Sequence, residues 1–140
     1  MVALAAAAIL MNTASAGKRD FPAFDSTHAH CAIETTYLKQ SCADIFGNFY
    51  STIYDFSPEA RSGGYYRIKE VLDNDYIWCS RTSPDQELID DVIFVFVQQH
   101  VEDGFQCMVQ ARSRSQNTPY FDHDTNYCNM WTVLRAVPAF

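Results

Sequence analysis

Arg112 and Arg114 alternate with serines in a segment, residues 105–115, that we expect to be a strand. Side chains two positions apart on a strand point to the same face, so the two guanidinium groups should lie side by side. Guanidinium groups bind carboxylate and sulfate through paired hydrogen bonds. The spacing favours an anion-binding site, and the alternative is a solvated outer face of the sheet.

Two short clusters hold the residue types that bind metal ions, namely His28, His30, Asp122, His123 and Asp124. Together they could hold zinc or copper, but their spacing matches no closed site. Aspartate and histidine in a loop more often cap turns through side-chain hydrogen bonds to the backbone. We therefore expect no metal and no other cofactor.

Motifs for catalysis are missing. The chain has no nucleophile elbow, zinc-protease helix, phosphate-binding loop or dinucleotide fingerprint. We therefore expect a binding or structural protein. The alternative is a small enzyme whose acid–base groups come from the segment 122–124 or from the arginine pair, in a pocket between helix and sheet.

Aromatic side chains are abundant, with ten Phe, eight Tyr and two Trp. That number exceeds what a small two-layer core requires, so some of them should line a pocket or a partner surface. The candidates are Tyr65, Phe94 and Phe96. Together with the arginine pair they predict a site for an apolar or anionic ligand between helix and sheet.

The composition sets the class of protein. A chain of 140 residues with 48% hydrophobic residues fits one folded domain. Seventeen acids against ten bases give a net charge of −7, which argues against nucleic-acid binding because such domains need a basic surface.

The first sixteen residues predict a secretory signal peptide. Residues 2–11 are apolar but too short to span a bilayer, and Ala14-Ser15-Ala16 has the small residues that a signal peptidase reads. We expect an extended arm at 17–29, one domain at 30–140, secretion, and no membrane span in the mature chain.

The segment 30–56 is predicted to be one long helix. Leu38, Cys42, Ile45 and Phe49 recur at steps of four, three and four residues, and Cys31 lies seven residues, about two helical turns, before Leu38. Ser57-Pro58 should end the helix, because the residue before a proline avoids the helical region.

The rest of the chain predicts antiparallel strands at 65–72, 75–82, 92–97, 105–115 and 127–137. Residues 92–97 are apolar on both faces and should form a central strand covered on both sides. A three-residue loop at Glu102-Asp103-Gly104 would place Val97 opposite Val109 and Phe94 opposite Arg112. The predicted fold is α+β: a long N-terminal helix on a curved five-stranded sheet, stabilised by disulfides, an architecture analogous to cystatin-like and NTF2-like folds.

Five cysteines are candidates for disulfides in an oxidising compartment: Cys31, Cys42, Cys79, Cys107 and Cys128. On one continuous helix Cys31 and Cys42 would lie about 16 Å apart, whereas a bridge needs Cα atoms within about 7 Å. At most two helix-to-strand bridges are therefore expected. The odd thiol, Cys128 or Cys79, would be buried and inert, paired with another chain, or reactive.

In size, signal and helix-then-sheet order the chain is similar to cystatins, the secreted inhibitors of cysteine proteases. Residues 99–104, Gln-His-Val-Glu-Asp-Gly, are similar to their Q-x-V-x-G loop but one residue longer, and no Pro-Trp pair supplies the second loop. The resemblance implies protease inhibition as one alternative. Our main expectation is a secreted binding or structural protein that forms a homo-oligomer or binds an extracellular protein.

Overall fold

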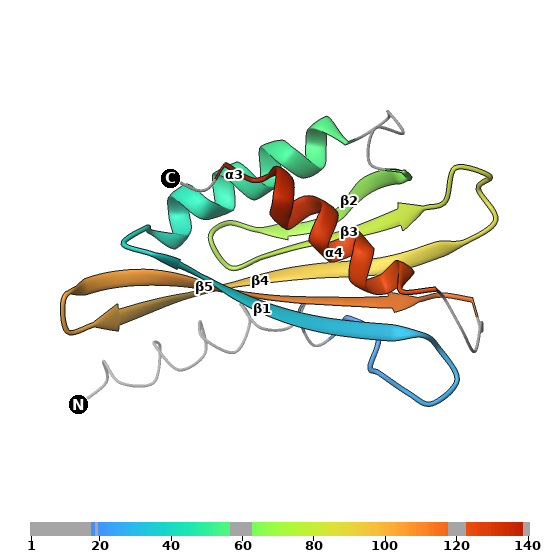
Figure 1. The fold of residues 1–140 in the computed structure, drawn as a ribbon, viewed down its shortest axis with the longest axis horizontal. Coiled ribbons are helices and arrows are strands. Elements are labelled where there is room, and N and C mark those ends of the chain that lie inside the picture. Colours follow the sequence, from blue (N-terminus) through green and yellow to red (C-terminus); the bar gives the residue numbers. More distant parts are fainter. Residues whose placement is uncertain (1–17, 19, 57–62, 118–122, 139–140) are drawn as a thin grey trace, which may run out of the picture.

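A computed structural model describes residues 18, 20–56, 63–117 and 123–138 of the chain, so the predicted signal peptide lies outside the described residues. Within them the elements are β1 (His30–Leu38), α3 (Cys42–Asp55), β2 (Tyr65–Leu72), β3 (Tyr76–Thr82), β4 (Ile89–Val101), β5 (Gly104–Ser115) and α4 (Thr125–Ala136). The strands form one antiparallel sheet in the order β1-β5-β4-β3-β2. Both helices cover the same face of this sheet (Figure 1). The α+β class with a five-stranded antiparallel sheet is confirmed.

The prediction of one long N-terminal helix at residues 30–56 is wrong. Residues 30–38 form strand β1, and the helix is the 14-residue α3. Between them Lys39 takes a positive φ of 56°, and the Ser41 side chain accepts a hydrogen bond from the Asp44 amide and so caps α3. The exposure of β1 alternates along its length, as expected of an edge strand with one covered face.

The prediction of a last strand at residues 127–137 is also wrong, because residues 125–136 form helix α4. The residues of α4 that are buried recur with helical spacing, at Asn126, Asn129, Met130 and Val133. Two of the four are asparagines, and a search for apolar periodicity does not count them. The number of strands still matches the prediction, because β1 replaces the strand expected at 127–137.

The β4–β5 hairpin differs from its predicted register by one residue. Its loop contains two residues, with Val101 opposite Gly104, instead of three. Phe94 consequently lies opposite Ala111, and Ile93 lies opposite Arg112. A shift of one residue exchanges the two faces of a strand relative to its partner. The phenylalanines therefore face the helices, and the arginines do not lie on the same face as the phenylalanines.

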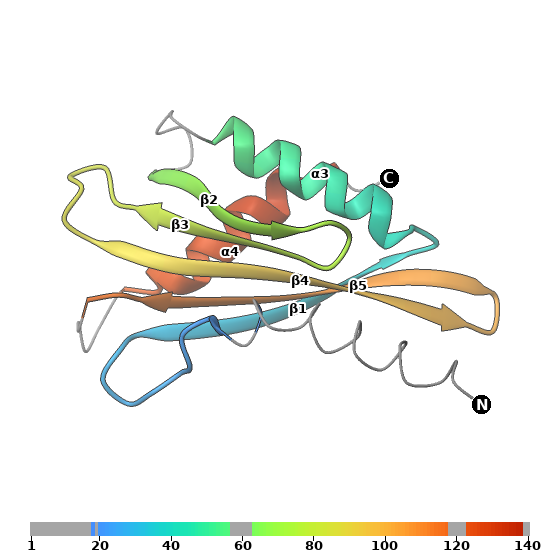
Figure 2. The ribbon, with the colours of Figure 1, turned by 180° about the vertical axis from the view of Figure 1, so that it is seen from behind.

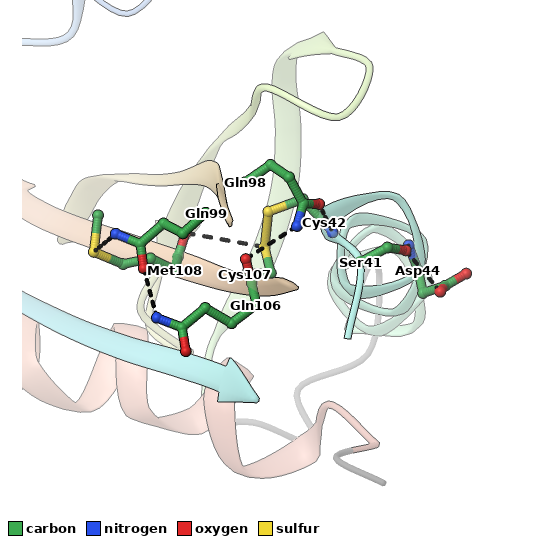
Figure 3. Close-up of a disulfide and its surroundings, with 8 residues drawn as sticks. All are labelled: Ser41, Cys42, Asp44, Gln98, Gln99, Gln106, Cys107 and Met108. Atoms are coloured by element: carbon green, nitrogen blue, oxygen red, sulfur yellow. Dashed lines mark hydrogen bonds between the residues drawn. A yellow bond between two sulfur atoms is a disulfide. The ribbon is translucent and has the colours of Figure 1, made fainter. Parts of the chain in front are cut away.

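The core lies between the sheet and the two helices. Phe49 of α3 is fully buried, with its ring centroid 5.2 Å from those of Phe94 and Phe96. The Cys42–Cys107 disulfide joins the first residue of α3 to β5 (Figure 3). It is a helix-to-strand bridge of the expected kind, whereas Cys79 and Cys128 form no disulfide.

The second face of the sheet is partly covered by residues 18–28, which we call the arm. Phe21 of the arm is buried against a small apolar cluster that contains Tyr76 and Ile93. The arm lies on the side of the sheet opposite to α3 and α4 (Figure 2). β4 is the middle strand, as its apolar run predicts, and the arm helps to cover it on the side that faces away from the helices.

Two buried tyrosines should make the fold sensitive to alkaline pH. Burial raises the pKa of Tyr37 to about 12. Burial, together with a hydrogen bond to Glu70, raises the pKa of Tyr76 to about 12. In the unfolded chain a tyrosine loses its proton near pH 10.

Because the folded state keeps these protons longer than the unfolded state, the free energy of unfolding is expected to fall as the pH rises from 10 to 12. Urea midpoints measured across this range test the prediction, with phenolate absorbance of the folded chain as the direct readout. Coincident absorbance curves for the folded chain and the urea-unfolded chain would contradict it.

Candidate binding face

We call the face of the sheet opposite to α3 and α4 the outer face. The strand register brings five of its side chains together at the centre. Trp78 lies opposite Ile93, Ile93 lies opposite Arg112, and Asp91 lies opposite Arg114. Alternation along each strand sends these side chains away from the helices. The outer face is therefore a mixed surface of charged and aromatic groups.

An open groove of about 810 Å³ lies on the outer face beside these residues. Strand β2 and its neighbours line it with Tyr65, Tyr66, Arg67, Ile68, Lys69, Ser80, Thr82, Gln86, Ile89 and Gln116. The set contains two bases and no acid, although the whole chain has a net charge of −7. We call this groove the outer groove.

Asp91 fixes one wall of the outer groove. Its Oδ1 accepts hydrogen bonds from Lys69 Nζ at 2.9 Å and from Trp78 Nε1 at 2.8 Å, and its Oδ2 accepts one from Gln116 Nε2 at 3.0 Å. The Lys69 ammonium also lies 4.5 Å from the centroid of the Trp78 ring. Both Lys69 and Arg67 are exposed, and the Lys69 ammonium group is held in place by Asp91, which balances its charge.

Arg67 forms no ion pair with the residues that the structure describes. Among the described residues, no ion pair balances the positive charge that Arg67 adds to the groove. Tyr65 supplies a half-buried ring, and Ser80 and Thr82 supply hydroxyl groups. Such a set suits a ligand with one negatively charged group and one flat apolar part.

The arm covers the arginine pair. Arg114 Nη2 donates a hydrogen bond to Asp25 Oδ2 at 2.6 Å and lies 2.9 Å from His28 Nδ1. The hydrogen bonds from Arg114 and then from His28 hold the pKa of Asp25 well below its usual range. The guanidinium carbon of Arg112 lies 5.3 Å from the Phe21 ring centroid and 4.6 Å from that of Phe24. Of the predicted anion-binding pair, Arg114 contacts a carboxylate of the chain itself, whereas Arg112 contacts two aromatic rings.

The structure does not bring the five predicted ligand-binding residues together. Phe94 and Phe96 belong to the core under α3. Arg112 and Arg114 lie on the outer face under the arm, and Tyr65 lines the outer groove. One predicted residue therefore contributes to the groove, and the others lie in different surroundings.

The metal candidates are also dispersed. His28 contacts Asp25, and His30 stacks on Phe24 with ring centroids 4.2 Å apart. His123 and Asp124 lie at the start of α4, whereas Asp122 lies outside the described residues. No group of three His, Cys, Asp or Glu side chains close enough to hold a metal ion occurs among the described residues.

Sequence reasoning missed a buried polar network that joins α4 to the sheet. Asn129 Nδ2 donates to Asp90 Oδ2 at 2.7 Å, and Ser115 Oγ donates to Asp90 Oδ1 at 2.8 Å. Asn126 donates to Ser115 Oγ at 3.0 Å, and its Oδ1 accepts from Ser113 Oγ at 2.6 Å. Two sequence patterns could have revealed this network. Asn126 and Asn129 are three residues apart and so share one face of a helix, and Ser113 and Ser115 are two residues apart and so share one face of a strand.

A second cavity, of about 410 Å³, lies between β1 and α4. Tyr127 and Trp131 form part of its wall and stack on each other with ring centroids 6.3 Å apart. Both residues are more than two-fifths exposed.

In the described part of the chain, no helix is long and apolar enough to cross a membrane.

Comparisons with known proteins give a likeness in shape alone. No family model and no curated protein matches the sequence. A putative uncharacterized protein from Rhizobium leguminosarum superimposes with a TM-score of 0.47 and 13% identity, over 79% of this chain and 91% of that one. The Mll3558 protein from Rhizobium loti gives 0.47 and 16%, over 78% and 94%. SA2116 from Staphylococcus aureus, a protein of unknown function, gives 0.41 and 14%, over 81% and 91%.

Proposed function

We propose that this chain is a secreted, non-enzymatic binding protein whose outer groove takes a small ligand with a negatively charged group and a flat apolar part. The observation that carries the proposal is the basic lining of a groove of about 810 Å³ in a chain of net charge −7. Volumes between about 300 and 1,000 Å³ are usual for small-molecule sites. The apolar run and cleavage pattern at residues 1–16 support secretion, as does a disulfide in the fold.

The charged group of the ligand would bind at Arg67. A carboxylate or sulfonate there would receive two parallel hydrogen bonds from the guanidinium group. Lys69 would add to the positive potential, but its ammonium group already contacts Asp91 and so attracts the ligand less strongly. The apolar part would lie along Tyr65 and Ile89, between the hydroxyl groups of Ser80 and Thr82.

The test uses the fluorescent probe 8-anilinonaphthalene-1-sulfonate, which combines a sulfonate with flat aromatic rings. R67E should weaken binding of the probe at least about tenfold, because it replaces the attracting charge with a repelling one; tenfold corresponds to about 1.4 kcal/mol. The matched control is R135E on α4, an exposed arginine on the helix side of the sheet that undergoes the same change of charge.

R135E should leave the probe's affinity within about twofold of the wild type. Arg135 lies on the other side of the sheet from the groove, and salt screens its charge from the bound probe. Y65A should also weaken binding, through the loss of the aromatic wall. If R67E and R135E lower the affinity equally, the probe senses net charge alone and the groove is not the site.

A further inference from the structure

The arm is bound to the outer face as a separate peptide would be. Its contacts are a salt bridge from Lys18 to Asp75, the burial of Phe21 against Trp78, and the ion pair of Asp25 with Arg114. None of the residues 20–28 forms a strand of the sheet. The first main-chain hydrogen bond to the sheet comes after the arm, from the Ser115 amide to the Ala29 carbonyl oxygen. Removing the arm from its place would therefore leave the sheet paired.

The surface beneath the arm matches it in charge and shape. We call this surface the arm site and define it by Asp75, Trp78, Ile93, Arg112 and Arg114. It offers a carboxylate to Lys18, a guanidinium group to Asp25, and a ring and an aliphatic side chain to Phe21. The Phe21 and Trp78 rings meet edge to face with centroids 5.6 Å apart, an attractive arrangement. The arm site thus recognises an aromatic and acidic segment by its side chains.

We propose that the arm site also binds the arm of a second copy of this chain, so that two chains exchange arms. An exchanged arm makes the same contacts as the chain's own arm, because every group that the arm site recognises belongs to residues 18–28. Exchange requires the turn at residues 25–28 to open, which breaks the hydrogen bonds that Asp25 Oδ1 accepts from the Thr27 and His28 amides. The second copy supplies Phe21 and Phe24 to the site.

The chain's own arm competes with the exchanged arm. A tethered segment acts at an effective concentration of about millimolar, so the wild-type chain fills its own site at lower protein concentrations. Exchange becomes measurable when the competing arm is weakened on one chain and the arm site on the other. A pair of complementary variants provides this condition.

The first variant, F21A/F24A, has a weakened arm and an intact arm site. The second variant, R112A/R114A, has an intact arm and a weakened arm site. Each variant alone should sediment as a monomer at about 100 µM, a concentration that detects dissociation constants up to that order. An equimolar mixture should contain a species of two chains. A mixture that sediments only as monomers overturns the proposal.

A second measurement covers the case in which R112A/R114A fails to fold. A synthetic peptide of residues 18–28 is titrated into the variant F21A/F24A/W131F, in which Trp78 is the only tryptophan. Trp78 contacts Phe21 in the fold, so its fluorescence reports binding of the peptide to the arm site. Saturable binding at least about tenfold tighter than that of the same peptide with both phenylalanines replaced by alanine supports the proposal. Equal affinity for the two peptides overturns it. Neither measurement involves Arg67, so the outcome is independent of the outer groove.

Discussion

Removal of the Cys42–Cys107 disulfide is expected to lower the free energy of unfolding by about 4 kcal/mol. The bridge closes a loop with a sequence separation of 65 residues, and the chain-entropy relation gives about that value for such a loop. It joins the first turn of α3 to β5, where the Cys42 amide also donates a hydrogen bond to Gln98 Oε1 at 2.8 Å (Figure 3). Without the bridge, α3 is held over the sheet by packing and by this hydrogen bond.

Urea unfolding of the wild type and of C42A/C107A measures this loss as a lower midpoint. The matched control is C128A, because Cys128 is an exposed cysteine that forms no disulfide. The C128A variant should differ from the wild type by less than about 0.5 kcal/mol, as is usual for surface positions. Equal midpoints for C42A/C107A and C128A would show that the bridge does not constrain the unfolded chain.

The variant D90A is expected to lower the free energy of unfolding by about 3 kcal/mol. The Asp90 carboxylate is 3% exposed and accepts hydrogen bonds from Ser115 and Asn129, with Arg81 Nη1 3.9 Å away. Removing the carboxylate leaves buried donors without their acceptor and takes away the negative charge that faces Arg81. The network ties α4 to β4 and β5, so the loss should loosen α4 first.

Thermal or urea unfolding gives the change in stability, and hydrogen exchange at α4 shows where the fold opens. The control is D103A, which removes the same group from the exposed tip of the β4–β5 hairpin. D103A should change the free energy of unfolding by less than about 0.5 kcal/mol. Similar losses in the two variants would mean that the buried network adds no stability beyond the charge itself.

Residues 30–56 show why the helix prediction failed. The steps from Cys31 to Leu38 and Cys42 suit a helix, yet Cys31, Ile33, Thr35 and Tyr37 also alternate as a strand does. Both patterns occur in the same stretch, and local spacing does not choose between them. Pairing of β1 with β5 decides the choice, because it satisfies the main-chain groups of β1 through a partner some eighty residues away.

The arginine pair shows how far the site could be predicted. The sequence predicted the position of both arginines on one face of a strand, and Arg114 contacts the Asp25 carboxylate, whereas Arg112 contacts aromatic rings. The prediction was wrong in placing the arginines on the same face of the sheet as Phe94 and Phe96. A hairpin loop one residue shorter than expected places Ile93, and not Phe94, opposite Arg112. The arginines therefore meet the arm, while the phenylalanines meet α3.

The sequence by itself determined the α+β class, the strands β2 and β3, the central position of β4 and the acidic charge of the chain. These features depend on composition and on contacts between neighbouring segments, and both can be read locally. Only the tertiary structure decided that residues 30–38 pair at the edge of the sheet, that 125–136 form a helix over buried asparagines, and that the arm covers the arginines. Each of these depends on partners distant in the sequence, whose contacts outweigh weak local preferences.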